Sequence, residues 1–383
     1  MVSTPPTGNK VFFENLDGLR FFCFLAVFLF HSFETQYAFI EDASLYKFFK
    51  HTLFGNGFLG VNFFFVLSGF LITYLLIKEK NTNKNIHIVN FWIRRILRIW
   101  PLYFACVFYG FVIFPLTKIA AGGVPAETAN PWYYLGFISN FDYIQKGLPD
   151  AKGLGVLWSV AIEEQFYLAW PVILSLFSVK RFWIPLLFIL VGSIVFRALN
   201  DVPILHEMHT LSCIGDMALG GLGAWCILET ASFKQKIAAL PRWSIVGIYV
   251  AFIFVFLFRD EFMLLNYPIR VFERLFISAI MLLIILEQCY SRNSFYKMQQ
   301  FKIPTRLGVI TYGLYCLHFI IISLTLGATK ILGLNTAVWQ VVFLETIIAL
   351  LITIGVSLLS YGFFEKPFLR LKDKFAFAPK KVA

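Results

Sequence analysis

The sequence predicts an all-α fold, a polytopic membrane bundle of about ten transmembrane helices with both termini in the cytoplasm. The first observation is composition, because 59% of the 383 residues are hydrophobic and only 14% are charged, whereas soluble domains carry about 25% charge. The second is recurrence, because apolar stretches of about 20 residues follow one another along the whole chain. The expected spans are 16–37, 58–78, 99–117, 156–178, 181–198, 209–229, 243–259, 269–288, 306–328 and 337–363.

Positive charge sets the expected orientation of these spans. Most of the 33 lysines and arginines fall in segments that lie inside when the N-terminus is cytoplasmic, as the positive-inside rule requires. The net charge of +11 is therefore a topology signal and needs no nucleic-acid partner. We expect a transmembrane domain over 1–365 and a basic cytoplasmic tail over 366–383.

The first expected span carries two polar residues in an apolar run. Arg20 and His31 are about three helical turns apart, roughly 16 Å along the axis, and share one face. Ionisable residues are costly inside a bilayer and usually mark function. A histidine in a span can also simply form a hydrogen bond between helices, so this structural interpretation stays open.

Polar residues from four spans fall at one depth, between the middle and the outer face of the bilayer. Histidine is a suitable base near neutral pH, and a carboxylate can orient it. Amide and hydroxyl groups can stabilise a developing oxyanion. The residues of this layer are His31, Asn62, Ser68, Glu163, Glu164 and His318.

A second polar layer is expected at the cytoplasmic face. Arg95 and Arg98 lie three residues apart on one helix face near the start of the third span, and Arg20 lies at the same surface. Guanidinium groups at a helix end suit phosphate. Anchoring by the positive-inside rule and contact with anionic membrane lipids are the alternative interpretation. Together the two layers suggest one extended ligand with a polyanionic end, such as an acyl-coenzyme A thioester.

Other polar residues have plainer interpretations. The six cysteines lie in apolar segments without metal-binding spacing, so no metal site is expected. His206 and His209 are expected to be an ordinary loop pair, and the outer loop 118–155 is a candidate cover for a cavity mouth. Gly220 and Ala224 indicate close helix packing. Three charged residues are expected to pair along one helix at the outer surface, in a structural role: Arg270, Glu273 and Arg274.

Five ordered motifs together resemble the acyltransferase 3 family, the bacterial membrane O-acetyltransferases of surface carbohydrates. They cover about 350 residues, which makes the match specific. The matching segments read LDGLRFFCFLAVFLFH from Leu16, GVNFFFVLSGFLIT from Gly60, FWIRRILRIWPLY from Phe91, LWSVAIEEQFYLAWP from Leu157, and the closing pieces ITYGLYCLH and FEKP.

The resemblance implies roles for individual residues. His31 would be the catalytic base, and Arg20, Arg95 and Arg98 would be essential, on the acyl-donor side. The motif contains both Glu163 and Glu164 without settling which one acts.

This chain departs from the family at two positions. Asn62 stands where the family usually has Asp, so a charged role there is doubtful. Ile214 stands where a basic residue is expected shortly before Asp216, which weakens an ion-pair role for Asp216. Some relatives continue into a soluble esterase-like domain, whereas here only the basic tail is expected.

The combined expectation is a multi-pass acyltransferase of the bacterial inner membrane. It would move an acyl group, most simply acetyl, from cytoplasmic acyl-CoA to a hydroxyl of a surface or lipid-linked carbohydrate. Acyl-CoA would be a co-substrate, and no permanently bound cofactor is expected. Direct transfer and a transient acyl-enzyme on Ser68 or His31 both stay open. The alternatives are a transporter or flippase without covalent chemistry and a structural subunit of a polysaccharide-assembly complex.

Overall fold

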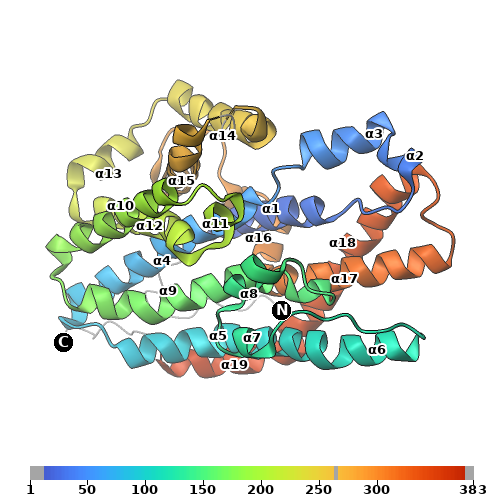
Figure 1. The fold of residues 1–383 in the computed structure, drawn as a ribbon. Helices are drawn as coiled ribbons and strands as arrows, with labels where there is room; N and C mark the ends of the chain where they lie inside the picture. The colour runs from blue at the N-terminus through green and yellow to red at the C-terminus, as the bar shows by residue number, and fades with distance from the viewer. Residues whose placement is uncertain (1–12, 263–265, 376–383) are drawn as a thin grey trace.

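The structure is a computed structural model that describes residues 13–262 and 266–375, and no strand occurs within these ranges. The long helices run roughly side by side across the molecule (Figure 1). The first half contains α1 (Glu14–His31), α2 (Ala38–Glu41), α3 (Ser44–Lys47), α4 (Leu59–Asn83), α5 (Ile88–Phe108), α6 (Phe114–Ala120), α7 (Pro131–Leu135), α8 (Ser139–Lys146) and α9 (Leu157–Ser175). The second half contains α10 (Trp183–Leu199), α11 (Pro203–Met208), α12 (Thr210–Glu229), α13 (Ala231–Ala238), α14 (Arg242–Phe262), α15 (Tyr267–Tyr290), α16 (Lys302–Gly308), α17 (Thr311–Ile331), α18 (Thr346–Leu359) and α19 (Lys366–Lys372).

The all-helical class is confirmed for the described residues, and six helical segments are long and apolar enough to cross a membrane. A seventh is possible if the bent pair α13 and α14, which meet at 87°, counts as one span. The other expected spans coincide with α1, α9 and α15, which are helical. The number ten and the sidedness of the termini stay predictions. The six segments are Leu59–Asn83, Ile88–Ala120, Val179–Leu199, Thr210–Glu229, Thr311–Ile331 and Gln340–Lys372.

Two of the differences from the expected bounds affect the position of site residues. The first helix ends at His31, because Ser32 is extended and Phe33 has a φ of 66°, which a helix cannot accommodate. Lys50 then donates to the carbonyls of Phe30 and Ser32, which covers this helix end with a cation. The third span begins at Ile88, so its arginines lie inside the helix and not at its start.

Helices α4 and α12 form the most extensive helix–helix contact among the described residues. A Cβ added to Gly220 would meet the carbonyl oxygen of Val66 at 2.0 Å, and one added to Gly69 would meet that of Met217 at 2.0 Å. Only glycine allows backbones to approach this closely. Ala224, one turn further on, is fully buried. The expectation of close packing along this face of α12 is confirmed.

The connecting segments gather at the two ends of the bundle. Helices α2, α3 and α6 lie at one end, with the connection between α17 and α18, and α13 lies at the other (Figure 1). Segment 118–155, which contains α7 and α8, folds back on α9. Gln165 of α9 donates to the carbonyl of Phe137 and to the Asn140 side chain, which fastens this segment over the helices.

Candidate active site

Most of the predicted site residues line one of two separate cavities. The histidine cavity, about 320 Å³, is lined by His31 and Asn62 and by Tyr143 and Leu148 of segment 118–155. This segment therefore lines a cavity, and its role as the cover of a cavity mouth stays a prediction. The arginine cavity, about 490 Å³, is lined by Arg20, Arg95, Arg98, Ser68 and Glu163.

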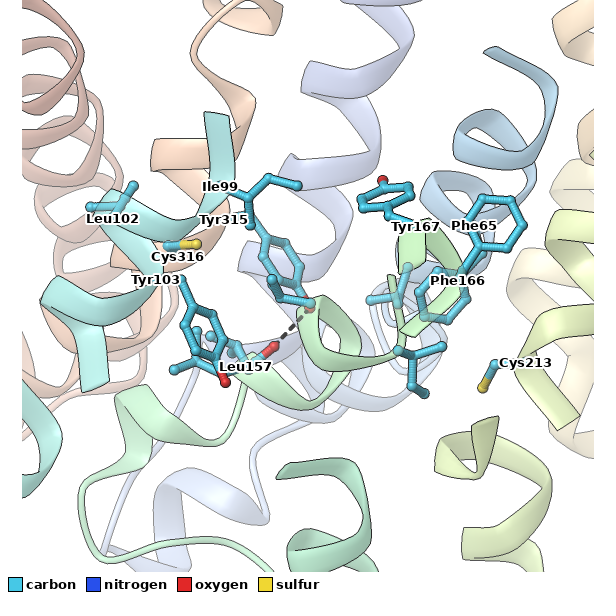
Figure 2. Packing of buried hydrophobic residues seen from close by; sticks show 14 of the residues in the cluster. Phe65, Ile99, Leu102, Tyr103, Leu157, Phe166, Tyr167, Cys213, Tyr315 and Cys316 are labelled. Atoms are coloured by element: carbon cyan, nitrogen blue, oxygen red, sulfur yellow. Dashed lines mark hydrogen bonds between the residues drawn. The ribbon is translucent and has the colours of Figure 1, made fainter. Parts of the chain in front are cut away.

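A thin partition separates the two cavities. Val61 of α4 and Tyr315 of α17 line both of them. The Tyr315 hydroxyl lies 2.6 Å from the Ser159 hydroxyl and 3.3 Å from the carbonyl oxygen of Val156, so α9 fixes the ring. In Figure 2 this ring is at the centre of the packed side chains, with Tyr103 on one side and Tyr167 on the other. The two polar layers therefore adjoin each other across one aromatic side chain.

His31 pairs with the second histidine of its layer. Its Nδ1 atom lies 3.1 Å from Nε2 of His318, and its ring stacks on Phe319 with 4.5 Å between centroids. His318 is fully buried, and its own Nδ1 lies 2.6 Å from the backbone carbonyl oxygen of Tyr315. The carbonyl group of Tyr315, the His318 ring and the His31 ring thus lie in a row of hydrogen-bond contacts that ends at the cavity.

This chain of contacts selects the tautomer of each ring. A carbonyl oxygen only accepts, so Nδ1 of His318 must carry the hydrogen. In the neutral ring Nε2 of His318 then accepts, and Nδ1 of His31 must donate to it. The Nε2 atom of His31 is left with a free lone pair. His318 occupies the place that a carboxylate holds in a hydrolase triad.

The two glutamates lie elsewhere. Glu163 accepts a hydrogen bond from Ser68 at 2.7 Å and faces the arginine cavity. Glu164, the next residue, accepts from Trp100 at 2.8 Å and lines neither cavity. Neither glutamate has a hydrogen bond to His31 among the described residues. The expected carboxylate contact with His31 is therefore wrong, because equal depth does not imply a shared helix face; any catalytic role of the glutamates stays a prediction.

The arginine cavity contains guanidinium groups without acidic partners. Arg20 forms an ion pair with Asp17 at 2.5 Å. Within residues 13–262 and 266–375, by contrast, neither Arg95 nor Arg98 forms a salt bridge, and the Nε atom of Arg95 is buried without a partner. Arg95 instead lies over the Tyr167 ring, 5.3 Å from its centroid. Such groups are costly to bury, so this cavity suits an anionic ligand.

Asp216 has the ion-pair role that its neighbours in sequence did not suggest. Arg274 of α15 binds its carboxylate at 2.8 Å, and Ser278 donates to it at 2.7 Å. Asn62 of α4 donates its amide to the same carboxylate at 3.3 Å. The expectation of a weakened ion pair is wrong because the cation comes from another helix. Asn62 is a neutral donor here, in keeping with the doubt about a charged role.

Sequence reasoning also missed a buried ionic network that lines the histidine cavity. Arg197 of α10 and Arg259 of α14 both bind Glu273 of α15. An arginine inside an apolar helix, as in VGSIVFRAL, was the available signal. Arg270, Glu273 and Arg274 do not pair along one helix as expected, because their ion-pair partners lie outside α15: Asp201 for Arg270, Arg197 and Arg259 for Glu273, and Asp216 for Arg274.

The HEMH segment has two separate structural roles. His206 is buried, and its Nε2 atom lies 3.0 Å from the carbonyl oxygen of Arg197. His209 caps α12 by accepting from the backbone of Leu211. No group of three histidine, cysteine, aspartate or glutamate side chains is placed to hold a metal ion in the described part of the chain.

Comparisons with known proteins agree over nearly the whole chain. Residues 13–362 match a family model described as an acyltransferase domain. The chain is 28% identical to peptidoglycan O-acetyltransferase OatA of Listeria monocytogenes, over 94% of this chain and 56% of the relative. It is 30% identical to O-acetyltransferase OatA of Staphylococcus aureus, over 97% and 59%, and 26% identical to putative peptidoglycan O-acetyltransferase YrhL of Bacillus subtilis, over 94% and 55%.

The chain therefore spans a little over half the length of these relatives. No solved structure matches it. The family match covers every predicted site residue, from Arg20 to His318. On this evidence the chain belongs to the acyltransferase 3 family.

Proposed function

We propose that this protein is a membrane acyltransferase that moves an acyl group, most simply acetyl, from acyl-CoA to a hydroxyl of a cell-wall carbohydrate. The observation that carries the proposal is the Nε2 atom of His31 in one cavity, which has no hydrogen bond among the described residues. One aromatic ring away, Arg95 and Arg98 of the next cavity form no salt bridge within the same residues. Relatives named peptidoglycan O-acetyltransferases support the acetyl group and the carbohydrate acceptor.

The arginine cavity would hold the phosphates of the donor. Arg95 and Arg98 carry guanidinium donors that no acidic side chain of the described residues satisfies, and Arg20 lies in the same cavity. Bidentate contacts between guanidinium and phosphate are strong and geometrically specific. The arm of the donor would then extend past Val61 and Tyr315 and bring the thioester to His31.

His31 would act as the general base in direct transfer. Its Nε2 atom removes the proton of the acceptor hydroxyl, and the hydroxyl oxygen attacks the thioester carbonyl carbon. The carbon–sulfur bond breaks as the ester bond forms, and the proton passes from the imidazolium to the departing thiolate. His318 keeps the His31 ring in the required tautomer and stabilises its charged form.

The two cavities also fit a division between the two membrane faces. We place the arginine cavity toward the cytoplasm, where acyl-CoA is made, and the histidine cavity toward the outer face of the bacterial inner membrane. Most positive charge falls on the segments assigned to the cytoplasm, which supports this orientation. The acceptor sugar would then enter from the outside, and no flippase would be needed for the acyl group.

The test uses membranes that contain the full chain and acetyl-CoA with a labelled acetyl group. His31→Ala should lose acetyl transfer by about 10²- to 10⁴-fold, the usual contribution of a general base, while it still binds labelled CoA. His51→Ala is the matched control, because His51 is exposed and lines neither cavity. Retained transfer in His31→Ala would refute the assignment, and transport without acetyl transfer in the wild type would favour a transporter.

A further inference from the structure

The wall of the histidine cavity formed by α11, α14 and α15 is built from ion pairs. Arg270 binds Asp201 at 2.8 Å, and Arg259 lies 3.5 Å from Glu207 while it also binds Glu273. All of these residues line the cavity. None of them is needed for the proton transfer at His31. Their presence beside the base therefore calls for another explanation.

The members of this wall divide into two groups by exposure. The side chain of Glu273 is only 6% exposed, and Arg197 and Arg274 are similarly buried, so these residues form the support. The side chains of Asp201 and Glu207 are 52% and 43% exposed, and Arg270 is 25% exposed. The Nε atom of Arg270 is buried without a partner. Three polar side chains thus face the cavity with donors and acceptors still available.

Charge balance indicates which ligand this wall fits. Each of its arginines has an acidic partner, whereas Arg95 and Arg98 of the other cavity have none among the described residues. A wall of fixed donors and acceptors without excess charge suits a neutral polyhydroxylated molecule better than an anion. Aromatic side chains also line the cavity. The guanidinium carbon of Arg259 lies 4.7 Å from the centroid of the Phe58 ring, and Trp158 is another lining residue. Aromatic faces stack on the apolar face of a sugar ring.

We propose that Asp201, Glu207 and Arg270 form the binding site for one neutral sugar ring of the acceptor. This inference rests on the proposed function and adds to it the residues that select the acceptor. The carboxylates accept from sugar hydroxyls, and Arg270 donates to a hydroxyl or an amide oxygen. A cavity of about 320 Å³ accommodates a small part of a glycan, so the remaining units of the chain lie outside it.

The first test measures binding of the N-acetylglucosamine tetrasaccharide to the purified full chain in detergent. Trp158 is the reporter, and its signal is identified by comparison with Trp158→Phe. Glu207→Gln and Arg270→Gln should each weaken binding about tenfold, as expected for a lost hydrogen bond to a charged group. Glu261→Gln is the matched control on α14, since Glu261 is exposed and lines neither cavity.

The outcomes separate the candidate ligands. Unchanged affinity in both variants, with normal melting curves, would overturn the proposal. Tighter binding of the tetrasaccharide in Glu207→Gln would also overturn it, because the Glu207 carboxylate would then not accept a hydrogen bond from a sugar hydroxyl. Weaker binding in both variants and an unchanged control supports it.

The second test separates this site from the proposed function. With labelled acetyl-CoA and the same tetrasaccharide, Glu207→Gln should raise KM for the saccharide more than it lowers kcat. Transfer with an unchanged saccharide KM would refute the acceptor site and leave the acyltransferase intact. A wild-type protein that binds the saccharide through Glu207 but transfers no acetyl would refute the proposed function and leave the sugar site standing.

Discussion

Replacement of His318 tests the mechanism most directly, because His318 touches no reacting atom in the proposed mechanism. The residue is fully buried, and its Nε2 atom accepts from Nδ1 of His31 at 3.1 Å. His318→Leu removes that acceptor and puts an apolar side chain of similar size in the place of the ring, against Phe24 and Phe28. The His31 ring then loses the contact that selects its tautomer and orientation.

The magnitude follows from two contributions. A lost hydrogen bond is worth about 0.5–1.5 kcal/mol, which lowers the population of the reactive tautomer by roughly two- to tenfold. A poorly held ring adds a loss of up to about 10²-fold through misplacement of the base. We therefore expect kcat of His318→Leu to fall by about 10- to 100-fold, less than the loss in His31→Ala. His318→Gln offers an amide oxygen near the Nε2 position and should recover part of that loss.

The assay is transfer of labelled acetyl from acetyl-CoA in membranes with matched amounts of protein. His51→Leu controls for the loss of an exposed imidazole, and thermal melting of the purified variants controls for folding. The KM for acetyl-CoA should stay near the wild-type value, because His318 does not line the arginine cavity. Wild-type kcat in His318→Leu, or equal losses in the Leu and Gln variants, would refute the role assigned to His318.

Two further predictions concern the arginine cavity. Arg95→Gln should raise KM for acetyl-CoA by about tenfold or more, because a charge-assisted bond to phosphate is lost. Arg94→Gln is its control, since Arg94 pairs with Glu79 outside the cavity; equal KM changes in the two variants would contradict the donor site. Ser68→Ala should keep kcat within about threefold under direct transfer, although its bond to Glu163 is lost. A collapse of kcat, with an acetyl group found on Ser68 by mass spectrometry, would instead establish an acyl-enzyme.

The grouping of the arginines could be predicted from the sequence, but the direction of each side chain around its helix could not. The spacing of apolar runs and loop charges placed Arg20 below His31 and Arg95 beside Arg98, and the arginine cavity contains all three arginines. Glu163 and Glu164 are consecutive, so about 100° of rotation separates them and they meet different neighbours. Depth alone could not reveal that Glu163 joins the arginine cavity.

The sequence also could not predict which residues of different helices contact each other. The contact of His31 with His318 joins positions 287 residues apart, and that of Asp216 with Arg274 joins α12 to α15. A single sequence shows which polar residues cost free energy when they are buried. It does not show which partner on another helix offsets that cost. Helix ends could be predicted only in part, because the end of α1 depends on the conformation of Phe33 and on Lys50 from a later segment.

The partition made by Val61 and Tyr315 has a consequence for the energy supply of the cell. Two polar cavities that joined would form an aqueous pore, and protons or sodium ions would leak through it down their gradients. Moving one charge across 100 mV is worth about 2.3 kcal/mol, so such a leak would dissipate the membrane potential. The Tyr315 ring, held by Ser159 and by the backbone of Val156, lies between the cavities and would keep them apart whenever the donor arm does not pass it. Under the proposed function, acyl transfer would thus connect the two faces of the membrane while the water of the two cavities stays separate.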